Sequence, residues 1–205
     1  MIGIIDYGLG NLASVRNAFE HLGHEARLYA KPGEAVVCDR LVLPGVGSFQ
    51  AGMLALEARG WAEALPDLVA ENRPLLGICL GMQLLFDIGE ENGPSRGLGL
   101  IPGMVVRLAP SEPHKVPHVG WNALPQMRRH PLLDGIRPHV DFYFVHSYHC
   151  IPASQDDAIA FSDFGGPFVA AAARGNIAGM QFHPEKSQPA GMRILENFVA
   201  WDGRC

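Results

Sequence analysis

The stretch Arg73-Pro-Leu-Leu-Gly-Ile-Cys-Leu-Gly-Met-Gln-Leu-Leu-Phe86 joins a short apolar run to a Gly-x-Cys-x-Gly turn and then to apolar residues at helical spacing. Leu75–Ile78 predicts a buried strand. The segment after Gly81 predicts a helix, because neither Gly nor Pro recurs before Gly89. Cys79 then lies at the tip of a sharp strand-to-helix turn, where free N–H groups and the helix dipole stabilise a thiolate. The stretch predicts a nucleophilic thiol, although a lone cysteine is more commonly a buried structural residue.

Apolar runs and helical patterns alternate along the first half of the chain, and β-rich segments with turns follow after residue 97. In the first half, strands are predicted at Met1–Asp6, Glu25–Ala30, Arg40–Leu43 and Leu75–Ile78, and helices at Leu12–Leu22, Phe49–Ala58 and Trp61–Glu71. In the second half, strands are predicted at Leu100–Leu108, Val116–Leu124, Asp141–Ser147, Ala158–Ser162, Phe168–Ala173 and Ile177–Phe182, much of them antiparallel, and a last helix begins near Ser187. This order predicts an α/β fold with one domain over residues 1–205. We expect one mixed, mostly parallel sheet flanked by helices, with the chemistry at the carboxyl ends of its strands.

Charge and composition exclude several kinds of partner. The net charge is −5 and the longest basic cluster is Arg128-Arg129-His130, too short to follow a phosphate backbone, so no nucleic-acid partner is expected. The amino terminus lacks the basic start and long apolar core of a signal peptide, and no apolar run approaches about 18 residues. We therefore expect a cytoplasmic protein without a membrane partner. The cysteines at positions 38, 79, 150 and 205 show no C-x-x-C pairing, which predicts reduced thiols rather than disulfides or a zinc site.

A catalytic thiol needs a base, and the base needs an orienting partner. In Ile177-Ala-Gly-Met-Gln-Phe-His-Pro-Glu-Lys186, a strand ends at His183, and Glu185 follows across a proline that fixes the turn. This spacing can hold the carboxylate near one imidazole nitrogen and leave the other nitrogen for the thiol. The alternative is a surface His and Glu in an ordinary loop.

Attack on a carbonyl also requires donors for the oxyanion. Leu43-Pro-Gly-Val-Gly-Ser-Phe49 follows a predicted strand, and its glycines let backbone N–H groups approach a ligand closely. Val46 and Gly47 are the candidate donors, together with Leu80 at the start of the Cys79 helix. The alternative for the loop is an ordinary glycine turn.

Three other patterns fail on their context. Gly93-Pro-Ser-Arg-Gly97 matches Gly-x-Ser-x-Gly but follows polar residues instead of a strand. Gly8-x-Gly10-x-x-Ala13 imitates part of a dinucleotide fingerprint, yet no acidic residue ends the second strand. The histidine pairs 114/118 and 146/149 have metal-like spacing, but neither pair has a suitable set of further ligands nearby.

Pro-Gly-Val-Gly, Gly-Ile-Cys-Leu-Gly-Met-Gln and His-Pro-Glu occur in this order, and together they closely resemble the triad-type (class I) glutamine amidotransferases. The resemblance covers essentially the whole chain and implies their flavodoxin-like fold. Three further segments resemble one branch of that family, the glutaminase subunits of imidazole glycerol phosphate synthases in histidine biosynthesis. They are Asp6-Tyr-Gly-Leu-Gly-Asn11, Pro117-His-Val-Gly-Trp-Asn122 and Tyr143-Phe-Val-His-Ser-Tyr148.

The resemblance implies a role for each matching residue. Cys79 is the nucleophile, His183 the general base and acid, and Glu185 the orienting carboxylate, so that glutamine is hydrolysed through a γ-glutamyl thioester. The residues that the resemblance assigns to the amino-acid end of glutamine are Gln83, Glu91, Ser147 and Tyr148, the last two through their backbone. A helix-surface glutamine and a solvated Glu90-Glu91 pair are the alternatives for the first two. No cofactor or metal is implied.

The resemblance also implies a partner, because free ammonia is mostly protonated in neutral water and must be delivered along an enclosed path. The expected acceptor is a separate synthase (cyclase) subunit with a (β/α)₈ barrel, which forms a heterodimer with this chain and switches on its activity. The implied contact residues are Asn11, Trp121, Tyr143 and Lys186, with ordinary packing as the alternative for the two aromatic rings. Two other functions stay open: a glutaminase for another synthase, such as one in the pyridoxal-phosphate or anthranilate pathways, and a catalytically silent regulatory module.

Overall fold

The first half of the chain builds the parallel part of the main sheet. In the computed structural model, which describes residues 1–70 and 72–204, β1 (Ile2–Ile5) lies between β2 (Ala26–Tyr29) and β3 (Arg40–Gly45), and β3 pairs with β4 (Leu75–Cys79). All these pairs are parallel. The residues of β1 and β4 are buried throughout, as expected for strands covered on both faces. The predicted strands of this half are confirmed. Residue 71, the predicted end of one helix, and Cys205 lie outside the described residues.

The second half continues the same sheet with antiparallel pairs. β14 (Ile177–Met180) is parallel to β4 and antiparallel to β13 (Pro167–Arg174), and this pairing joins the two halves. The sheet then continues through β11 (Tyr148–Pro152), β7 (Ile101–Arg107), β5 (Phe86–Gly89) and β6 (Ser95–Arg96), while β12 (Ala158–Asp163) and β9 (Gln126–Met127) extend from β13. The mixed sheet is confirmed. The parallel pairs are β2–β1, β1–β3, β3–β4, β4–β14 and β5–β7. The other described pairs of this sheet are antiparallel.

Two of the predicted strands do not belong to this sheet, so the expectation of one sheet is wrong. β8 (His118–Ala123) and β10 (Asp141–His146) form a separate antiparallel pair. The reason is their alternation: Phe142 and Phe144 on the inner face are fully buried. Between ring centroids, Phe144 lies 5.6 Å from Phe168 of β13, and Phe142 lies 4.3 Å from Phe182, just after β14. A strand pair that presses one face of large rings onto the sheet forms a layer above it.

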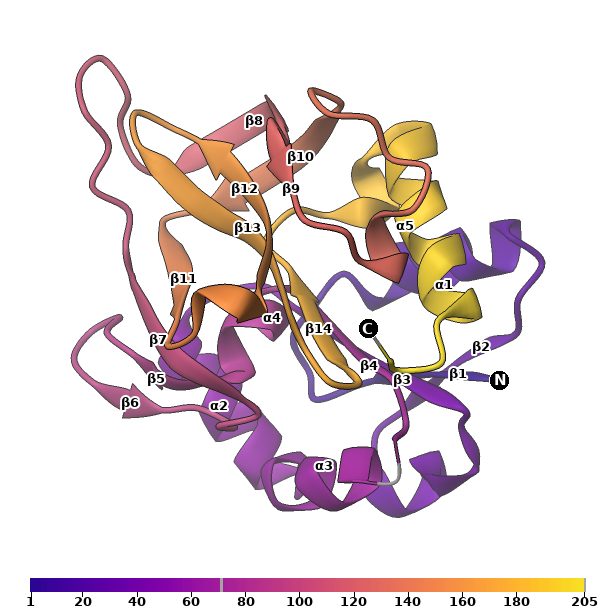
Figure 1. Cartoon of the computed structure of the whole chain (residues 1–205). Helices are drawn as coiled ribbons and strands as arrows, with labels where there is room; N and C mark the ends of the chain where they lie inside the picture. Colours follow the sequence, from indigo (N-terminus) through magenta and orange to yellow (C-terminus); the bar gives the residue numbers. More distant parts are fainter. Residues whose placement is uncertain (71, 205) are drawn as a thin grey trace.

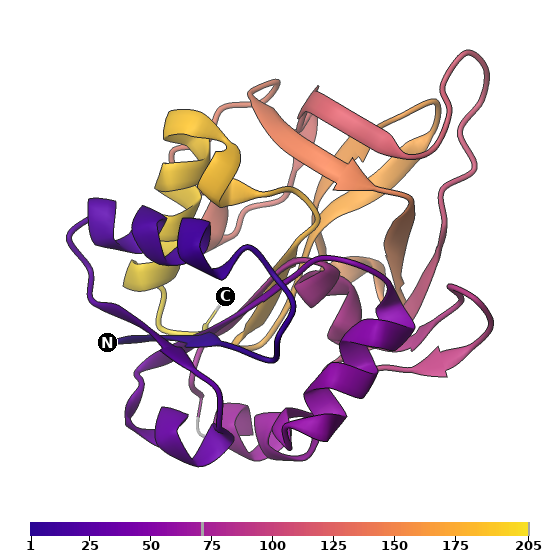
Figure 2. The same ribbon diagram turned by 180° about the vertical axis from the view of Figure 1, so that it is seen from behind.

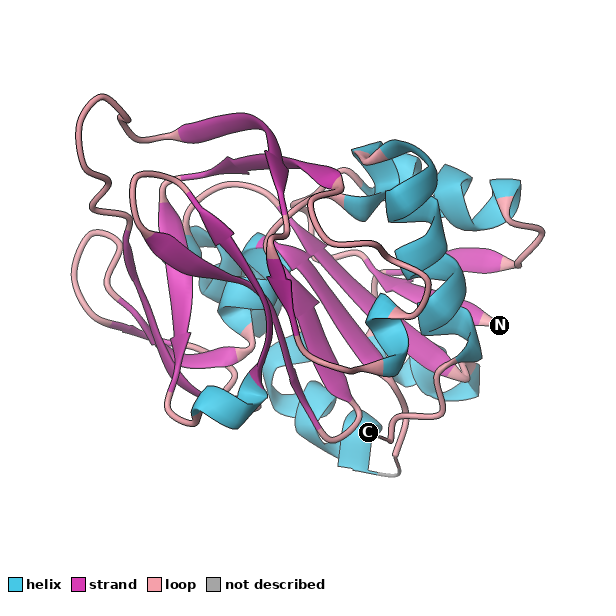
Figure 3. Ribbon diagram, turned by 45° about the horizontal axis from the view of Figure 1, so that its top comes forward, coloured by secondary structure: helices cyan, strands magenta, loops and turns pink. Residues whose placement is uncertain are grey.

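Helices cover both faces of the main sheet. α1 (Leu12–His21) and α5 (Gln188–Ala200) lie on one face, and α2 (Phe49–Ala58) and α3 (Trp61–Ala70) lie on the other (Figures 1 and 2). Successive residues of a strand face opposite sides, so β3 contributes Val42 to the first core and its neighbours to the second. Figure 3 shows the strands passing between the two groups of helices. No helix in the described ranges is both long and apolar enough to traverse a bilayer.

The helix after Cys79 is much shorter than the sequence pattern suggests. α4 spans only Leu80–Leu84, and the chain then turns into β5. The carbonyl of Leu85 accepts hydrogen bonds from the N–H groups of Leu100 and Ile101 at the start of β7. This carbonyl is therefore not available to extend α4 by another helical hydrogen bond. Leu85 and Phe86 are 0% exposed, and their burial stabilises the turn from α4 into β5. Tertiary contacts therefore override the helical spacing.

Gly81 allows β3 and α4 to approach each other closely, and its substitution gives a first prediction. A Cβ atom there would lie 1.8 Å from the Leu43 carbonyl oxygen, a backbone atom that cannot rotate away. We expect Gly81→Ala to lower the free energy of unfolding by about 3 kcal/mol. The control is Gly33→Ala, where an added Cβ meets no atom within 4 Å, and we expect it to change stability by less than about 1 kcal/mol. Urea unfolding followed by circular dichroism measures both; equal midpoints for Gly81→Ala and the unmodified chain would contradict the prediction.

Candidate active site

Cys79 ends β4 in a strained conformation. Its φ of 54° and ψ of −111° lie outside the regions that ordinary residues favour, and such strain is typically kept where function requires it. The side chain is only 6% exposed. Its Sγ lies 3.7 Å from the carbonyl oxygen of Val145 and 4.0 Å from Nε2 of Gln181. The turn therefore aims the thiol at the space between β4 and β10, at the carboxyl end of the parallel strands.

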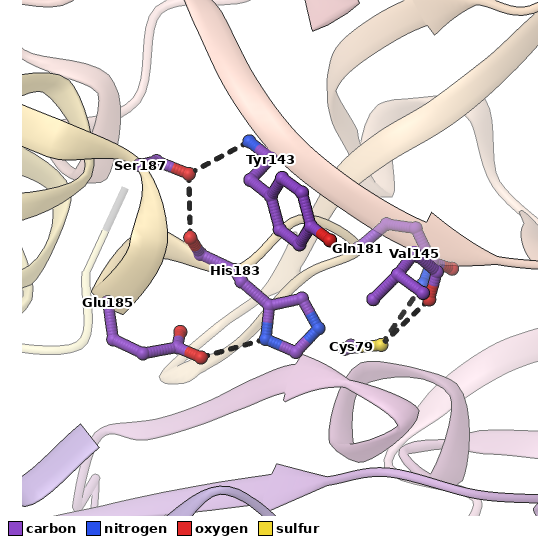
Figure 4. A network of polar contacts seen from close by, with 7 residues as sticks. All are labelled: Cys79, Tyr143, Val145, Gln181, His183, Glu185 and Ser187. Atoms are coloured by element: carbon purple, nitrogen blue, oxygen red, sulfur yellow. Dashed lines mark hydrogen bonds and ion pairs between the residues drawn. The ribbon is translucent and has the colours of Figure 1, made fainter. Parts of the chain in front are cut away.

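His183 and Glu185 meet as their spacing predicts. Nδ1 of His183 lies 2.8 Å from Oε1 of Glu185, and the two side chains are 2% and 1% exposed. The alternative of a surface His and Glu is therefore wrong. A carboxylate accepts from Nδ1–H, so Nε2 stays available on the other side of the ring. Figure 4 shows the imidazole between Glu185 and Cys79.

The electrostatics of His183 favour its charged form. Burial lowers the pKa of this imidazole, but the neighbouring Cys79 and Glu185 raise it more strongly, to about 9. Nε2 is buried and has no hydrogen-bond partner among the described residues. Contacts of catalytic groups are commonly long without substrate and tighten when it binds. The imidazolium form of His183 is therefore favoured near neutral pH.

The backbone of His183 is fixed from two sides. Its N–H donates to the carbonyl of Tyr143 (2.9 Å), and its carbonyl accepts from the hydroxyl of Ser187 (2.6 Å). The same hydroxyl accepts from the N–H of Tyr143 (3.0 Å). Ser187 occupies the N-cap position of α5 as predicted, but its side chain does not cap the helix. Its hydroxyl instead links the backbone of His183 to that of Tyr143 on β10.

A cavity of about 330 Å³ opens above the thiol. Its lining includes two residues of the predicted triad, all three predicted oxyanion donors and all four predicted glutamine-binding residues. The lining residues are Val46, Gly47, Cys79, Leu80, Gln83, Glu91, Pro117, Val145, His146, Ser147, Tyr148 and His183. Sequence reasoning missed Pro117, Val145 and His146, although all three lie in segments that carry the family resemblance. Glu185 lies behind His183, outside this wall.

Gln83 and Glu91 are both held in place. Gln83 is 5% exposed, and its Nε2 donates to the Tyr148 carbonyl (2.9 Å) and to Oε1 of Gln181 (3.0 Å), so the helix-surface alternative is wrong. Glu91 accepts a hydrogen bond from the N–H of Phe49 (2.7 Å) at the start of α2. A carboxylate held there can pair with an ammonium group in the cavity.

The glycine loop lies beside the thiol. β3 ends at Gly45, directly opposite Cys79 in the register of β3 and β4, and the loop residues follow from there. Gly47 has a φ of +105° with open space around its missing side chain, and Val46 is 42% exposed. A loop with this freedom can turn its N–H groups towards a developing oxyanion.

The residues of the implied contact surface gather next to the site. Trp121 is 47% exposed and packs edge-on against Tyr143, with 5.9 Å between ring centroids. Nζ of Lys186 lies 5.7 Å from the centre of the Tyr143 ring. Asn11, just before α1, lines a small internal gap behind the triad. The Tyr143 ring connects Trp121 to the base, since its centre is 6.3 Å from that of the His183 ring.

The described residues contain no group of three or more His, Cys, Asp or Glu side chains that could hold a metal ion. Cys38 and Cys150 are buried free thiols, and burial raises the pKa of Cys150 far above its usual value. Neither thiol lines the cavity over Cys79.

A thiol on a strand-to-helix turn, backed by an imidazole and a carboxylate at the carboxyl ends of parallel strands, defines an α/β enzyme class that transfers acyl groups through a cysteine. Residues 3–201 match the glutamine amidotransferase class-I family, and the chain belongs to that family. "Imidazole glycerol phosphate synthase subunit HisH" of Desulfitobacterium hafniense (strain DSM 10664 / DCB-2) is 49% identical over 201 residues, 98% of this chain and 94% of that protein.

Two further relatives extend the comparison. "Imidazole glycerol phosphate synthase hisHF, chloroplastic" of Arabidopsis thaliana is 46% identical over 202 residues, which cover 97% of this chain but 34% of that protein. A solved structure described as a glutamine amidotransferase covers 98% of both chains with a TM-score of 0.76 and 18% identity. At that identity, the likeness shows a shared fold.

Proposed function

We propose that this chain is the glutaminase subunit of an imidazole glycerol phosphate synthase: it hydrolyses glutamine to glutamate and ammonia and passes the ammonia to a separate synthase subunit. The observation that carries the proposal is the buried constellation of Cys79 and His183 in the cavity wall, with Glu185 hydrogen-bonded to His183 behind it. Near-full-length relatives of the same description support the acceptor reaction. An intact constellation also argues against a catalytically silent module.

In the proposed reaction, the Cys79 thiolate attacks the side-chain amide carbon of glutamine and forms a C–S bond. N–H groups of Val46, Gly47 and Leu80 donate hydrogen bonds to the oxyanion that forms. Nε2 of His183 gives its proton to the leaving nitrogen and the C–N bond breaks. Ammonia departs, and a γ-glutamyl thioester remains on Cys79. Water then attacks this thioester while His183 takes its proton, and glutamate leaves as the thiol is restored.

Glutamine enters with its amino-acid end away from the thiol. Gln83, Glu91 and the backbone at Ser147 and Tyr148 line that part of the cavity wall, and the Glu91 carboxylate pairs with the α-ammonium.

The partner in this proposal is a (β/α)₈ barrel that forms a heterodimer with this chain. The Arabidopsis relative supports an association, because about two thirds of that protein lies outside the part that matches this chain. The contact face includes Trp121, Tyr143 and Lys186, with exposed Val119 and Val145 on the same side of the β8–β10 pair. An apolar centre with aromatic rings and a cationic rim is typical of an interface.

The function is tested by mixing the purified chain with a candidate barrel subunit and its nucleotide substrate. We expect imidazole glycerol phosphate to form from glutamine only when this chain is present, and from ammonium salts without it. The isolated chain is expected to hydrolyse glutamine slowly, because the glycine loop donors are not yet oriented. Glutamine hydrolysis that supports a different synthase and not this one would reassign the acceptor.

Trp121→Ala tests the contact face. We expect the dissociation constant of the complex to rise on the order of 30-fold, because central aromatic anchors contribute about 2 kcal/mol to such interfaces. Titration calorimetry with the barrel subunit measures the change. Leu54→Ala is the control, since Leu54 is 58% exposed on α2, far from β8 and β10. Equal affinity for Trp121→Ala and Leu54→Ala would remove Trp121 from the interface.

A further inference from the structure

Two buried histidines lie beside the cavity and have no part in the proposed reaction. His118 on β8 and His146 on β10 stand directly opposite each other in the strand register. They are 3% and 6% exposed, and His146 also lines the cavity. Buried polar side chains are costly unless each hydrogen-bonding atom has a partner, so the partners of these rings are informative.

The two rings belong to a continuous chain of hydrogen bonds. Nδ1 of His146 lies 2.8 Å from the carbonyl oxygen of Tyr148, and its Nε2 lies 3.0 Å from Nδ1 of His118. Nε2 of His118 lies 3.3 Å from Nδ2 of Asn122. All four imidazole nitrogens are therefore engaged, and the chain runs from β8 to the wall of the cavity.

The direction of every bond is fixed from both ends. A carbonyl oxygen only accepts, so His146 carries its proton on Nδ1 and accepts from His118 at Nε2. At the other end, the Asn122 amide is oriented because its Nδ2 also donates to the Asp163 carbonyl (2.7 Å) and its Oδ1 accepts from the N–H of Ala123 (2.8 Å). Both histidines are thus neutral, with the proton on Nδ1.

Packing and electrostatics agree with this assignment. The His118 ring is stacked between Phe144 (4.9 Å between centroids) and Phe164 (4.2 Å), so it has little rotational freedom. Burial lowers the pKa of His118 to about 4 and that of His146 to about 3, which keeps both rings neutral near pH 7.

The chain of bonds ends on one atom of the glutamine site. The Tyr148 carbonyl accepts from His146 and also from Nε2 of Gln83 (2.9 Å), so both of its lone pairs are occupied. With both lone pairs in use, that carbonyl is not available to the ammonium of glutamine, whereas the Glu91 carboxylate on the same wall is. The carbonyl instead fixes the orientation of the Ser147–Tyr148 backbone.

We propose that His146, supported by His118 and Asn122, is a positioning residue that sets the Ser147–Tyr148 backbone for the amino-acid end of glutamine. The proposal rests on the proposed glutaminase function. It assigns the two histidines to substrate affinity and not to the bond-breaking steps, because neither ring contacts the thiol or its base. Their effect should therefore appear in KM and not in kcat.

The kinetic test uses the chain in complex with its barrel partner. We expect His146→Leu, which removes the donor to Tyr148, to raise KM for glutamine about tenfold, with kcat unchanged within about threefold. His146→Asn retains an N–H donor near the Nδ1 position and should recover most of the affinity. His149→Leu is the matched control: His149 lies on β11, the next strand along the chain, and its buried Nδ1 has no partner among the described residues. A KM for His146→Leu within about twofold of the unmodified value would overturn the proposal.

A spectroscopic test needs no histidine variant and covers the case in which His146→Leu fails to fold. Nitrogen NMR of the imidazoles should show both His118 and His146 as neutral Nδ1–H forms at neutral pH, and glutamine added to the Cys79→Ala chain should shift the His146 Nδ1–H signal. Protons on Nε2, or no shift on saturation with glutamine, would overturn the proposal. If the unmodified complex does not hydrolyse glutamine, the proposed function fails instead, while the imidazole assignment is still measured.

Discussion

Cys79→Ala is expected to reduce glutamine hydrolysis by on the order of 10⁴-fold or more, because the covalent route is lost and only binding and oxyanion donors remain. The nucleophile has no substitute in the described part of the cavity, whose lining contains Cys79 as its one thiol. The change should leave the fold intact, since it removes a single sulfur atom from a turn fixed by the close approach of β3 and α4.

The measurement separates chemistry from assembly. The complex of Cys79→Ala with its barrel partner should lose synthesis from glutamine and retain synthesis from ammonium salts, since the synthase chemistry lies in the other subunit. Cys150→Ala is the matched control: it also removes a buried thiol, but one on β11 that does not line the cavity, and it should keep both activities. Loss of both activities in Cys79→Ala would indicate failed assembly, and residual glutamine hydrolysis within about tenfold of normal would exclude Cys79 as nucleophile.

The elbow could be predicted from sequence because its constraints are local. A strand, a tight turn and a helix start impose small residues at Gly77 and Gly81, and the structure shows why: a Cβ at either position would lie less than 3 Å from backbone atoms of a neighbouring segment. The meeting of His183 with Glu185 was predictable for the same reason, since a two-residue spacing across Pro184 leaves few geometries.

Features that depend on distant packing could not be predicted. The length of α4 is set by bonds from Leu100 and Ile101 to Leu85, and no pattern near Cys79 reports them. The separation of β8 and β10 from the main sheet depends on rings such as Phe182, which are about 40 residues away in sequence from Phe142. The catalytic and binding roles of individual side chains stay predictions until the variants are measured.

Glu185→Gln is expected to lower kcat by on the order of 10³- to 10⁴-fold, an effect comparable to that of the equivalent change in serine-protease triads. The Glu185 carboxylate only accepts, so it keeps the proton of the neutral imidazole on Nδ1 and leaves Nε2 free to take a proton from the thiol. A glutamine amide can donate to Nδ1 instead, which moves that proton to Nε2, the wrong side for a base. The buried charge that stabilises the imidazolium is lost as well.

The pH profile distinguishes this cause from simple disorder of the site. His183 has a pKa of about 9, raised by Cys79 and Glu185 against the opposing effect of burial, so the imidazolium is present below that pH and is lost above it. Activity of the unmodified complex should fall as pH rises through about 9. In Glu185→Gln, one of the two groups that raise the pKa of His183 is gone. The loss of activity with rising pH should therefore begin at a lower pH. Glu196→Gln, a half-exposed carboxylate paired with Arg193 on α5, is the control and should leave both rate and profile unchanged. A Glu185→Gln profile with normal kcat and no shift of this loss to lower pH would show that the carboxylate does not orient the base.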